Sequence, residues 1–248
     1  MILARLRAAR PPEPGHIVVP HGTGSFTVAL KRSSTARRYT LRVCSGSGAI
    51  VMTLPAKADL RTASDFAARH TGWIAARLAR LPEMIAMEPG ATVPFRGVPH
   101  RIEHRPGMRG AVRVETGADG APVIAVSGLP EHARRRVNDF LKREAGKDLA
   151  AAVSRHAAAL GVVVSGITLR DTRSRWGSCT SAGRLNFSWR LIMAPPFVLD
   201  YLAAHEATHR REMNHSNRFW RLLKEICSAT DEAEAWLDRN GPGLHRYR

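Results

Sequence analysis

The sequence predicts an α+β protein in which a β-rich N-terminal region precedes a mainly helical region with a small β-hairpin. Two observations predict this class. Short apolar stretches in the first half alternate with polar residues and are separated by Gly/Ser turns, which is typical of strands. Longer stretches in the second half repeat their apolar residues every three or four positions, which is typical of amphipathic helices. We place the boundary between residues 129 and 130, so that 1–129 form the β-rich region with one helix.

The first half contains two groups of predicted strands on either side of that helix. Strand-like alternation runs through residues 16–55, with turns at HGTG and CSGSGA. A helix is expected over about 58–81, where apolar side chains recur at helical spacing. Short strands return over residues 91–127, so both strand groups belong to the N-terminal region.

The second half opens with an alanine-rich helix from Pro130 to about Leu160, which has no interior proline. The segment that begins GITLR is expected to be a strand running into a loop, and RLNFSWRLIM (184–193) is a second strand of a hairpin. Another helix begins near Pro196, since proline is tolerated in the first turn, where its missing N–H has no intrahelical partner.

The bulk composition is that of a soluble globular protein, with 44% hydrophobic and 24% charged residues. No apolar run is long enough to cross a bilayer, so we expect no membrane partner. The first residues, MILARLRAARPPEPG, carry arginines and no useful apolar core, so no signal peptide is expected. Three widely separated cysteines argue against a disulfide framework and indicate a reducing compartment, so we expect a cytoplasmic location.

The formal net charge of +17 indicates an anionic partner such as nucleic acid or a nucleotide. Only five of the 38 basic residues are lysine, however, so arginine supplies almost all of the excess. A GC-rich genome can produce the same arginine bias, and the basic residues are spread along the chain. The net charge therefore leaves a nucleic-acid role open without locating it.

The stretch YLAAHEATHRREMNHSNRFW (201–220) holds three of the chain's 11 histidines. His205 and His209 are four residues apart, so on a helix their imidazoles lie roughly 40° apart around the axis and about 6 Å along it. They share one side of the helix with the apolar residues Val198 and Leu202, so they face inward. Both can reach one ion, and neutral imidazole suits zinc. The pattern predicts one zinc ion per chain.

His215 is the expected third ligand, although it lies six residues beyond His209 and would face roughly 240° away on a continuous helix. The helix must therefore end between the two histidines. We place the break at Met213–Asn214, because asparagine tolerates a left-handed C-terminal conformation. Asn214 or Ser216 can then cap the next helix.

Glu206 follows the first histidine and completes an HExxH pattern, HEATH. It projects roughly 100° from His205, close enough to reach a metal-bound water without binding the metal. Zinc lowers the pKa of such a water toward about 7, and Glu206 would act as the general base that takes its proton. A pair of core histidines bonded to carbonyl groups is the alternative, and it explains neither Glu206 nor His215.

Six segments of the sequence are distinctive in combination: RWGSC (175–179), LNFSWRLIMAPPFVLDYLAAHEATH (185–209), NHSNRFW (214–220), ARRYTLRV (36–43), LPAKA (54–58) and GWIAARL (72–78). Together they resemble the YgjP-like metallopeptidase family, which is related to the SprT and WLM zinc-peptidase groups. The resemblance implies a zincin-like metallohydrolase domain over residues 130–248, with His205, His209 and His215 as zinc ligands and Glu206 as catalytic base. Thr208 is a minor departure, since members usually carry a small or apolar residue there.

Three functions remain open. A zinc-dependent peptidase would bind a peptide or protein substrate as an added strand along the edge supplied by residues 184–190. A metal-dependent nucleotide or phosphate-ester hydrolase would use hairpin arginines to bind phosphate. A nucleic-acid-associated protein would use zinc as a structural ion with four protein ligands. The arginines of the hairpin region are Arg173, Arg175, Arg184 and Arg190.

Candidate substrate-binding residues are Asn186, Arg175 and Arg184, which are polar residues on or beside the predicted hairpin. For Asn186 a structural hydrogen bond explains its position equally well. Phe219 and Trp220 stand at the start of the helix after His215, and we expect them to brace the helix that carries the other two histidines.

Overall fold

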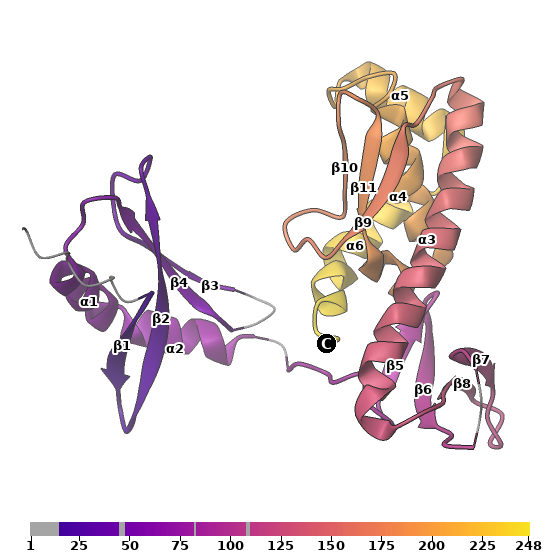
Figure 1. Cartoon of the computed structure of the whole chain (residues 1–248). Helices are drawn as coiled ribbons and strands as arrows, with labels where there is room; N and C mark the ends of the chain where they lie inside the picture. Colours follow the sequence, from indigo (N-terminus) through magenta and orange to yellow (C-terminus); the bar gives the residue numbers. More distant parts are fainter. Residues whose placement is uncertain (1–14, 45–47, 82, 108–109) are drawn as a thin grey trace, which may run out of the picture. The chain divides into compact units, whose positions relative to one another are not determined.

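The structure is a computed structural model that describes residues 15–44, 48–81, 83–107 and 110–248. The chain forms two compact units, Met1–Pro82 and Glu83–Arg248 (Figure 1). The mixed α and β composition expected from the sequence is confirmed. The boundary expected between residues 129 and 130 lies inside the second unit, because Val93 and Ile124 pack in the same core as Leu141 and Leu149.

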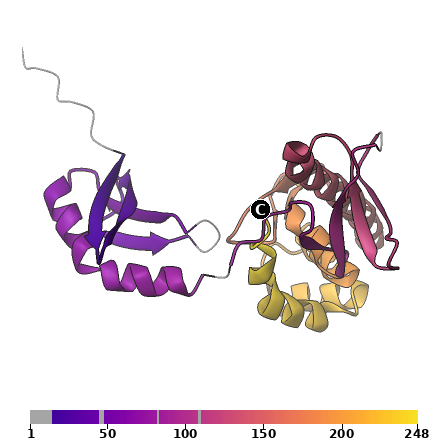
Figure 2. The same ribbon diagram turned by 90° about the horizontal axis from the view of Figure 1, so that it is seen from below.

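The first unit is a four-stranded sheet with two helices on one face (Figure 2). The strand order is β1-β2-β4-β3, with β2 and β4 parallel and the outer pairs antiparallel. Alternating residues of the strands point toward the helices and form a separate core that includes Val28, Met52 and Ile74. The elements are β1 (His16–His21), β2 (Gly24–Ser33), β3 (Thr40–Val43), β4 (Ile50–Pro55), α1 (Leu60–Arg69) and α2 (Thr71–Ala79).

The single helix expected over 58–81 is divided into α1 and α2 at His70. Asp59 begins α1 because its carboxylate accepts a hydrogen bond from the Thr62 amide at 3.0 Å. At the division, the His70 backbone amide donates a hydrogen bond to Ala67 O. The Nδ1 atom of the His70 ring lies 2.7 Å from Phe66 O. The break turns the chain so that Ile74 on α2 reaches the same core as Ala67 on α1.

The second unit combines a second four-stranded sheet, a three-stranded sheet and four longer helices, with α3 running along one side (Figure 1). Gly161 ends α3 in the left-handed conformation, at φ 61°, which glycine adopts without strain. The elements are β5 (Thr92–Phe95), β6 (Val98–His104), β7 (Arg113–Thr116), β8 (Pro122–Val126), η1 (Pro130–His132), α3 (Ala133–Leu160), β9 (Gly166–Arg170), β10 (Gly177–Cys179), β11 (Arg184–Ser188), η2 (Trp189–Met193), α4 (Pro196–Thr208), α5 (Asn217–Ile226) and α6 (Thr230–Leu244).

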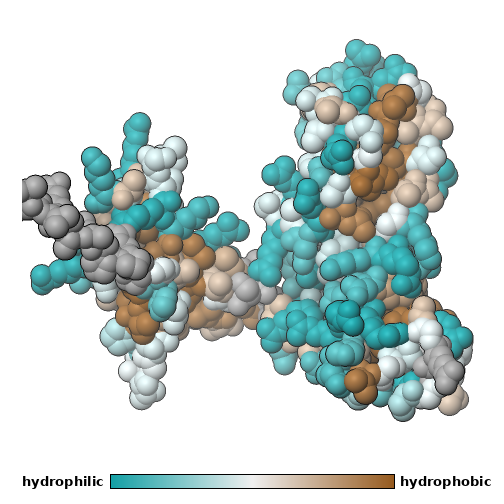
Figure 3. Space-filling model, in the orientation of Figure 1, coloured by the Kyte–Doolittle hydropathy of each residue, from teal (hydrophilic) through white to brown (hydrophobic). Residues whose placement is uncertain are grey.

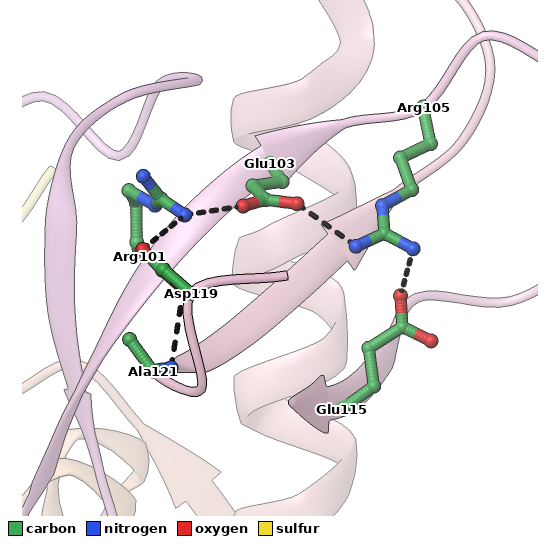
Figure 4. A network of polar contacts seen from close by, with 6 residues as sticks. All are labelled: Arg101, Glu103, Arg105, Glu115, Asp119 and Ala121. Carbon is green, nitrogen blue, oxygen red and sulfur yellow. Dashed lines mark hydrogen bonds and ion pairs between the residues drawn. The ribbon is translucent and has the colours of Figure 1, made fainter. Parts of the chain in front are cut away.

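The sheet β5-β6-β8-β7 repeats the strand order and directions of the first sheet, with its central pair parallel. Its polar face carries a chain of alternating charges (Figure 4). Arg101 contacts Glu103 at 2.6 Å, and Arg105 joins Glu103 at 2.9 Å to Glu115 at 2.6 Å. These side chains are partly exposed, so each ion pair is expected to add little to the stability of the fold.

The three-stranded sheet has the order β10-β11-β9, with β10 antiparallel and β9 parallel to β11. The strand β11 is therefore central, and the expectation that residues 184–190 offer a free edge is wrong. The free edge nearest α4 belongs to β10, which packs against that helix. The predicted strand is also shorter than expected, since residues Trp189–Met193 form the 3₁₀ helix η2.

The helix α4 is held against α3 by a partly exposed polar link. Asp200 on α4 accepts hydrogen bonds from His156 Nε2 at 3.0 Å and from Arg155 at 2.7 Å. The bond from His156 lowers the pKa of Asp200, so its carboxylate remains charged.

Hydrophilic side chains cover much of the face of each unit seen in Figure 3, with apolar patches between them. Within the described ranges, no helix is both long and apolar enough to span a membrane.

Candidate metal centre

The helix α4 carries His205 on its inner side, and His209 is the C-cap residue that follows its last turn. It begins with Pro196 in the first turn, as expected, and its inward residues Val198, Leu202 and Ala203 are buried in the core. His209 is 8% exposed and Glu206 is 4% exposed, so the polar groups of this helix lie within packed protein. Burial of several ionisable groups on one helix is costly unless they are paired or bind an ion.

The helix ends at Thr208, five residues earlier than the break expected at Met213–Asn214. Asn214 is not left-handed, since Arg96 is the one non-glycine residue with positive φ in the described part of the chain. A tight turn from His209 to Glu212 changes the chain direction instead. Ser216 then caps α5, as expected, by accepting a hydrogen bond from the Phe219 amide at 3.3 Å.

This turn brings His215 back to the other two histidines. The Nε2 atoms of His205 and His215 lie 3.0 Å apart, and one ring nitrogen from each of the three residues lies within 4.8 Å of the others. The ring centroids of His209 and His215 are 4.7 Å apart. The three imidazoles therefore converge on one point, as the sequence predicted.

Phe219 forms the apolar floor under the three imidazoles. It is fully buried, and its ring centroid lies 4.9 Å from that of His205, 4.6 Å from His209 and 4.7 Å from His215. Trp220 covers His215 from one side, at 5.8 Å between centroids. The expectation that these two aromatic residues brace α4 is confirmed, because they pack directly on its histidines.

His205 and His209 use their Nδ1 atoms for hydrogen bonds to groups outside the cluster. The Nε2 atom of His205 lies 3.0 Å from that of His215. His205 Nδ1 lies 3.3 Å from the Tyr201 hydroxyl, which donates its proton to Glu234 Oε1 at 2.8 Å. The hydroxyl oxygen must therefore accept from His205 Nδ1–H. His209 Nδ1 lies 3.1 Å from Glu212 O, which can only accept. Both bonds set the tautomer in which Nε2 carries a lone pair.

Electrostatics keep these imidazoles neutral. Burial, together with the neighbouring His209 and His215, lowers the pKa of His205 to about 3. Burial also lowers the pKa of His209. Burial and the bond to Glu234 raise the pKa of Tyr201, so its hydroxyl remains a proton donor. Neutral imidazole is the form that binds a metal ion.

Glu206 has one carboxylate oxygen without a partner. Its Oε2 is buried and accepts no hydrogen bond, and burial raises the pKa of Glu206 to about 8 although the charge of Arg175 lowers it. The carboxylate lies against Gly177 of β10, where a Cβ would come within 2.8 Å of Glu206 Cγ. Position 177 must therefore be glycine for the carboxylate to lie here.

A cleft of about 410 Å³ opens beside His205 and Glu206. One wall is formed by Trp176, which stacks on His245 at 5.0 Å between centroids, and by Gly177 of the free strand edge. The cleft also reaches Glu234 on α6. The buried carboxylate and one of the three imidazoles can thus be reached from outside the protein.

The predicted substrate-binding residues lie at different places. Arg175 is close enough to Glu206 to affect its pKa. Asn186 pairs with Ser178 across β11 and β10, and its Nδ2 donates to Ser178 Oγ at 3.3 Å, so its amide already has a structural bond. Arg184 is exposed at the far end of β11, opposite Gly166 of β9. Of these three residues, Arg175 is the one whose charge acts on Glu206.

Arg190 does not belong to a cluster of hairpin arginines. It is 6% exposed, forms two bonds to Asp171 at 2.6 and 3.2 Å, and donates to the carbonyl oxygens of Leu244 and Tyr247. Burial by itself would raise the pKa of Asp171. The hydrogen bond and charge of Arg190, with the charges of His245 and Arg173, outweigh burial, so the pKa of Asp171 is lowered. Arg190 therefore fastens the C-terminal segment to the β9–β10 loop, and four of its five N–H donors are already bonded within the protein.

The sequence analysis did not identify Tyr201 as a residue of the site. Its position four residues before His205 places both side chains on the same side of the helix, and this spacing could have indicated the contact. The structure also shows that Glu234 of α6 supports His205 through the Tyr201 hydroxyl. The contact between Tyr201 and Glu234 joins residues 33 positions apart, and no local pattern indicates it.

The donor set fits one divalent ion. Zinc–nitrogen bonds are about 2.0–2.1 Å long, so nitrogens that already lie within 4.8 Å of one another are close to the spacing that a shared ion requires. A bound cation would also place a positive charge near Glu206 Oε2, which has no hydrogen-bond partner, and would favour the charged form of this carboxylate. Three converging imidazoles beside a buried carboxylate and a cleft are typical of metal-dependent hydrolases.

The comparisons with known proteins make this class more specific. Residues 37–240 match the family described as YgjP-like, metallopeptidase domain, and the chain belongs to that family. The protein is thus a member of a metallopeptidase family, and the resemblance seen in the sequence is confirmed. A similar solved structure is the metallopeptidase zymogen of Pyrococcus abyssi abylysin, with 17% identity, a TM-score of 0.35, and coverage of 40% of this chain and 97% of that chain. No curated protein matches the sequence.

Replacing Tyr201 by phenylalanine is expected to weaken metal binding by about 10- to 100-fold. The variant lacks the hydroxyl oxygen that accepts the hydrogen bond from His205 Nδ1, so the imidazole is no longer held in one orientation. Competition with a chromophoric chelator measures the affinity without an activity assay. Tyr247→Phe is the control, since Tyr247 belongs to the same unit and does not line the cleft. An unchanged affinity in Tyr201→Phe would show that the hydroxyl does not orient the ligand.

Proposed function

We propose that the chain is a zinc-dependent peptidase with a zincin-like catalytic unit, in which His205, His209 and His215 hold one zinc ion. Glu206 is the general base. The observation that carries the proposal is the convergence of three imidazoles beside a buried carboxylate oxygen that has no partner. Membership of a metallopeptidase family supports a peptide or protein as the substrate.

A zinc ion bound there would supply Lewis acidity and lower the pKa of a water molecule toward about 7. Glu206 is placed to take the proton of the attacking water on Oε2 and to return it to the leaving nitrogen. Gly177 keeps the space that this carboxylate occupies, and the bond to Glu212 O keeps His209 in its orientation. Phe219 excludes water from the other side of the imidazoles.

The free edge of β10 is the proposed docking strand for the substrate. Its residues Gly177–Cys179 pair with β11 on one side, which leaves the backbone groups of the other side available to an extended peptide. Gly177 touches Glu206, so a peptide added along this edge would pass the general base. Arg175 precedes the strand, and we assign it to the binding of a substrate carbonyl or carboxylate group.

The two alternative functions are less well supported. A structural zinc site has four protein ligands, whereas the histidine cluster of the described residues offers three, and one of them, His205, lines a cleft. A phosphate-ester hydrolase was favoured by four hairpin arginines, but Arg190 is buried and bonded to Asp171. The peptidase remains the function that agrees with both the site and the family.

A substrate panel with metal removal tests the proposal. The full chain, loaded with zinc, is expected to cleave casein, to lose that activity after dialysis against a chelator, and to regain it when zinc is added back. Fluorescent casein and a set of nucleoside triphosphates are assayed in parallel. If the chain hydrolysed nucleotides and left casein intact, the proposed peptidase activity would be contradicted and a phosphohydrolase would be supported.

A further inference from the structure

The first unit has a strongly unequal number of basic and acidic residues. Residues 15–81 contain ten lysines and arginines against two acidic residues, which gives a net charge of +8. One of the two acids, Asp59, is used to cap α1. A genomic preference for arginine over lysine would not produce this excess, because such an exchange leaves the charge unchanged. The scarcity of acidic residues indicates a polyanionic partner for this unit.

A pocket on the first unit gathers part of this charge around an exposed tryptophan. It has a volume of about 450 Å³ and lies between the edge strand β3 and the helix α2. Trp73 is 46% exposed, which is unusual for the largest apolar side chain. Arg77 and Arg80 follow it by four and seven positions on the same face of α2, and Arg42 comes from β3.

None of these three arginines is neutralised within the described part of the chain. Arg42, Arg77 and Arg80 are exposed, and no acidic side chain forms an ion pair with any of them. The small residue Ala76 stands between Trp73 and Arg80 and keeps the pocket open. The indole ring is therefore accessible, with guanidinium groups from two different elements around it.

We propose that the first unit binds single-stranded nucleic acid, with one base stacked on Trp73 and the neighbouring phosphates bound by Arg42, Arg77 and Arg80. Every base has a flat π-face that can stack on an indole ring, and arginine binds phosphate oxygens with two parallel hydrogen bonds. An acidic peptide would use the arginines and leave the ring without a matching partner. A lipid surface would need a broader apolar face than a single ring set in a hollow among arginines.

Fluorescence anisotropy with the full chain tests the proposal. Labelled single strands of about 12 nucleotides, as DNA and as RNA, match the usual site size of such proteins. We expect the logarithm of the affinity to fall linearly with the logarithm of the salt concentration between about 50 and 200 mM. A duplex of the same length, polyglutamate and phosphatidylserine vesicles are the competing ligands, and all three are expected to bind more weakly.

Two matched variants separate the pocket from general charge. Arg77→Gln with Arg80→Gln is expected to weaken single-strand binding at least tenfold and to reduce the salt slope by roughly 0.7 for each phosphate that is no longer bound. Arg61→Gln with Arg69→Gln removes the same charge from α1 and is expected to change the affinity by less than about threefold. Equal reductions in affinity for the two pairs would overturn the proposed site.

Trp73 provides the second criterion. Trp73→Ala is expected to weaken single-strand binding by about 5- to 100-fold, whereas Trp73→Phe retains an aromatic face and most of the affinity. All these residues are exposed, so thermal unfolding of the variants should match that of the parent chain. Vesicles or polyglutamate that compete as well as the oligonucleotide, or no binding at low salt, would overturn the proposal. Activity against casein plays no part in this test, so its outcome is independent of the proposed peptidase.

Discussion

Glu206→Gln is expected to reduce hydrolysis by roughly 10²- to 10⁴-fold, the usual contribution of a general base, while the metal content stays the same. Glutamine has the same shape as glutamate, so it fits the space beside Gly177. It cannot take a proton from water, so the step assigned to Oε2 is lost. None of the three imidazoles is altered, so the ion remains bound.

Initial rates on casein and the metal-to-protein ratio of the purified variant are the two measurements. Glu232→Gln is the matched control, because Glu232 is exposed on α6 and lies outside the cleft. It should keep the parent rate. If Glu206→Gln hydrolysed casein as fast as the parent chain, Glu206 would have no role in proton transfer.

His215→Ala is expected to weaken metal binding by about 10²-fold and to abolish hydrolysis. Structural zinc sites with four ligands bind with about 10–16 kcal/mol, so one ligand contributes roughly 3 kcal/mol, or about a factor of 10². His215 is exposed in the turn before α5, and its ring contacts the other imidazoles, Phe219 and Trp220. The fold should therefore survive its removal.

Competition with a chelator gives the affinity of the variant, and thermal unfolding of the metal-free protein confirms that it folds. His132→Ala is the control, since His132 is an exposed histidine in the same unit, at the start of α3. Its affinity should equal that of the parent chain. A His215→Ala protein that binds metal as tightly as the control would show that the third ligand is another group.

Most strands and helices were predicted correctly because their signals are local. The long helix α3 follows from its apolar spacing, and α4 follows from the same spacing together with Pro196 in its first turn. The division at His70 was not predicted, since both halves keep a helical pattern and the break depends on how α2 meets the sheet.

At the end of α4, the expected interruption of the helix before His215 is present, but its expected position is wrong. The argument that the helix must stop before His215 required only the geometry of a helix, and the structure agrees. The position of the stop was placed five residues too late, and Asn214 does not have the conformation assigned to it. The ring contacts of His209 and His215 with Phe219 depend on a packed core that the local sequence does not describe.

By itself the sequence determined the mixed fold class, the family, the spacing that puts two histidines on one helical side, and the need for a turn before the third. The histidine spacing and the need for a turn depend on residues within one or two helical turns of each other, whereas the fold class and the family follow from patterns repeated along the chain. Only the tertiary structure decided that Glu234 supports His205 through Tyr201, that β10 is the free edge, and that Arg190 is buried against Asp171. Such contacts join residues 19 to 33 positions apart, and they arise when separate elements pack against one core.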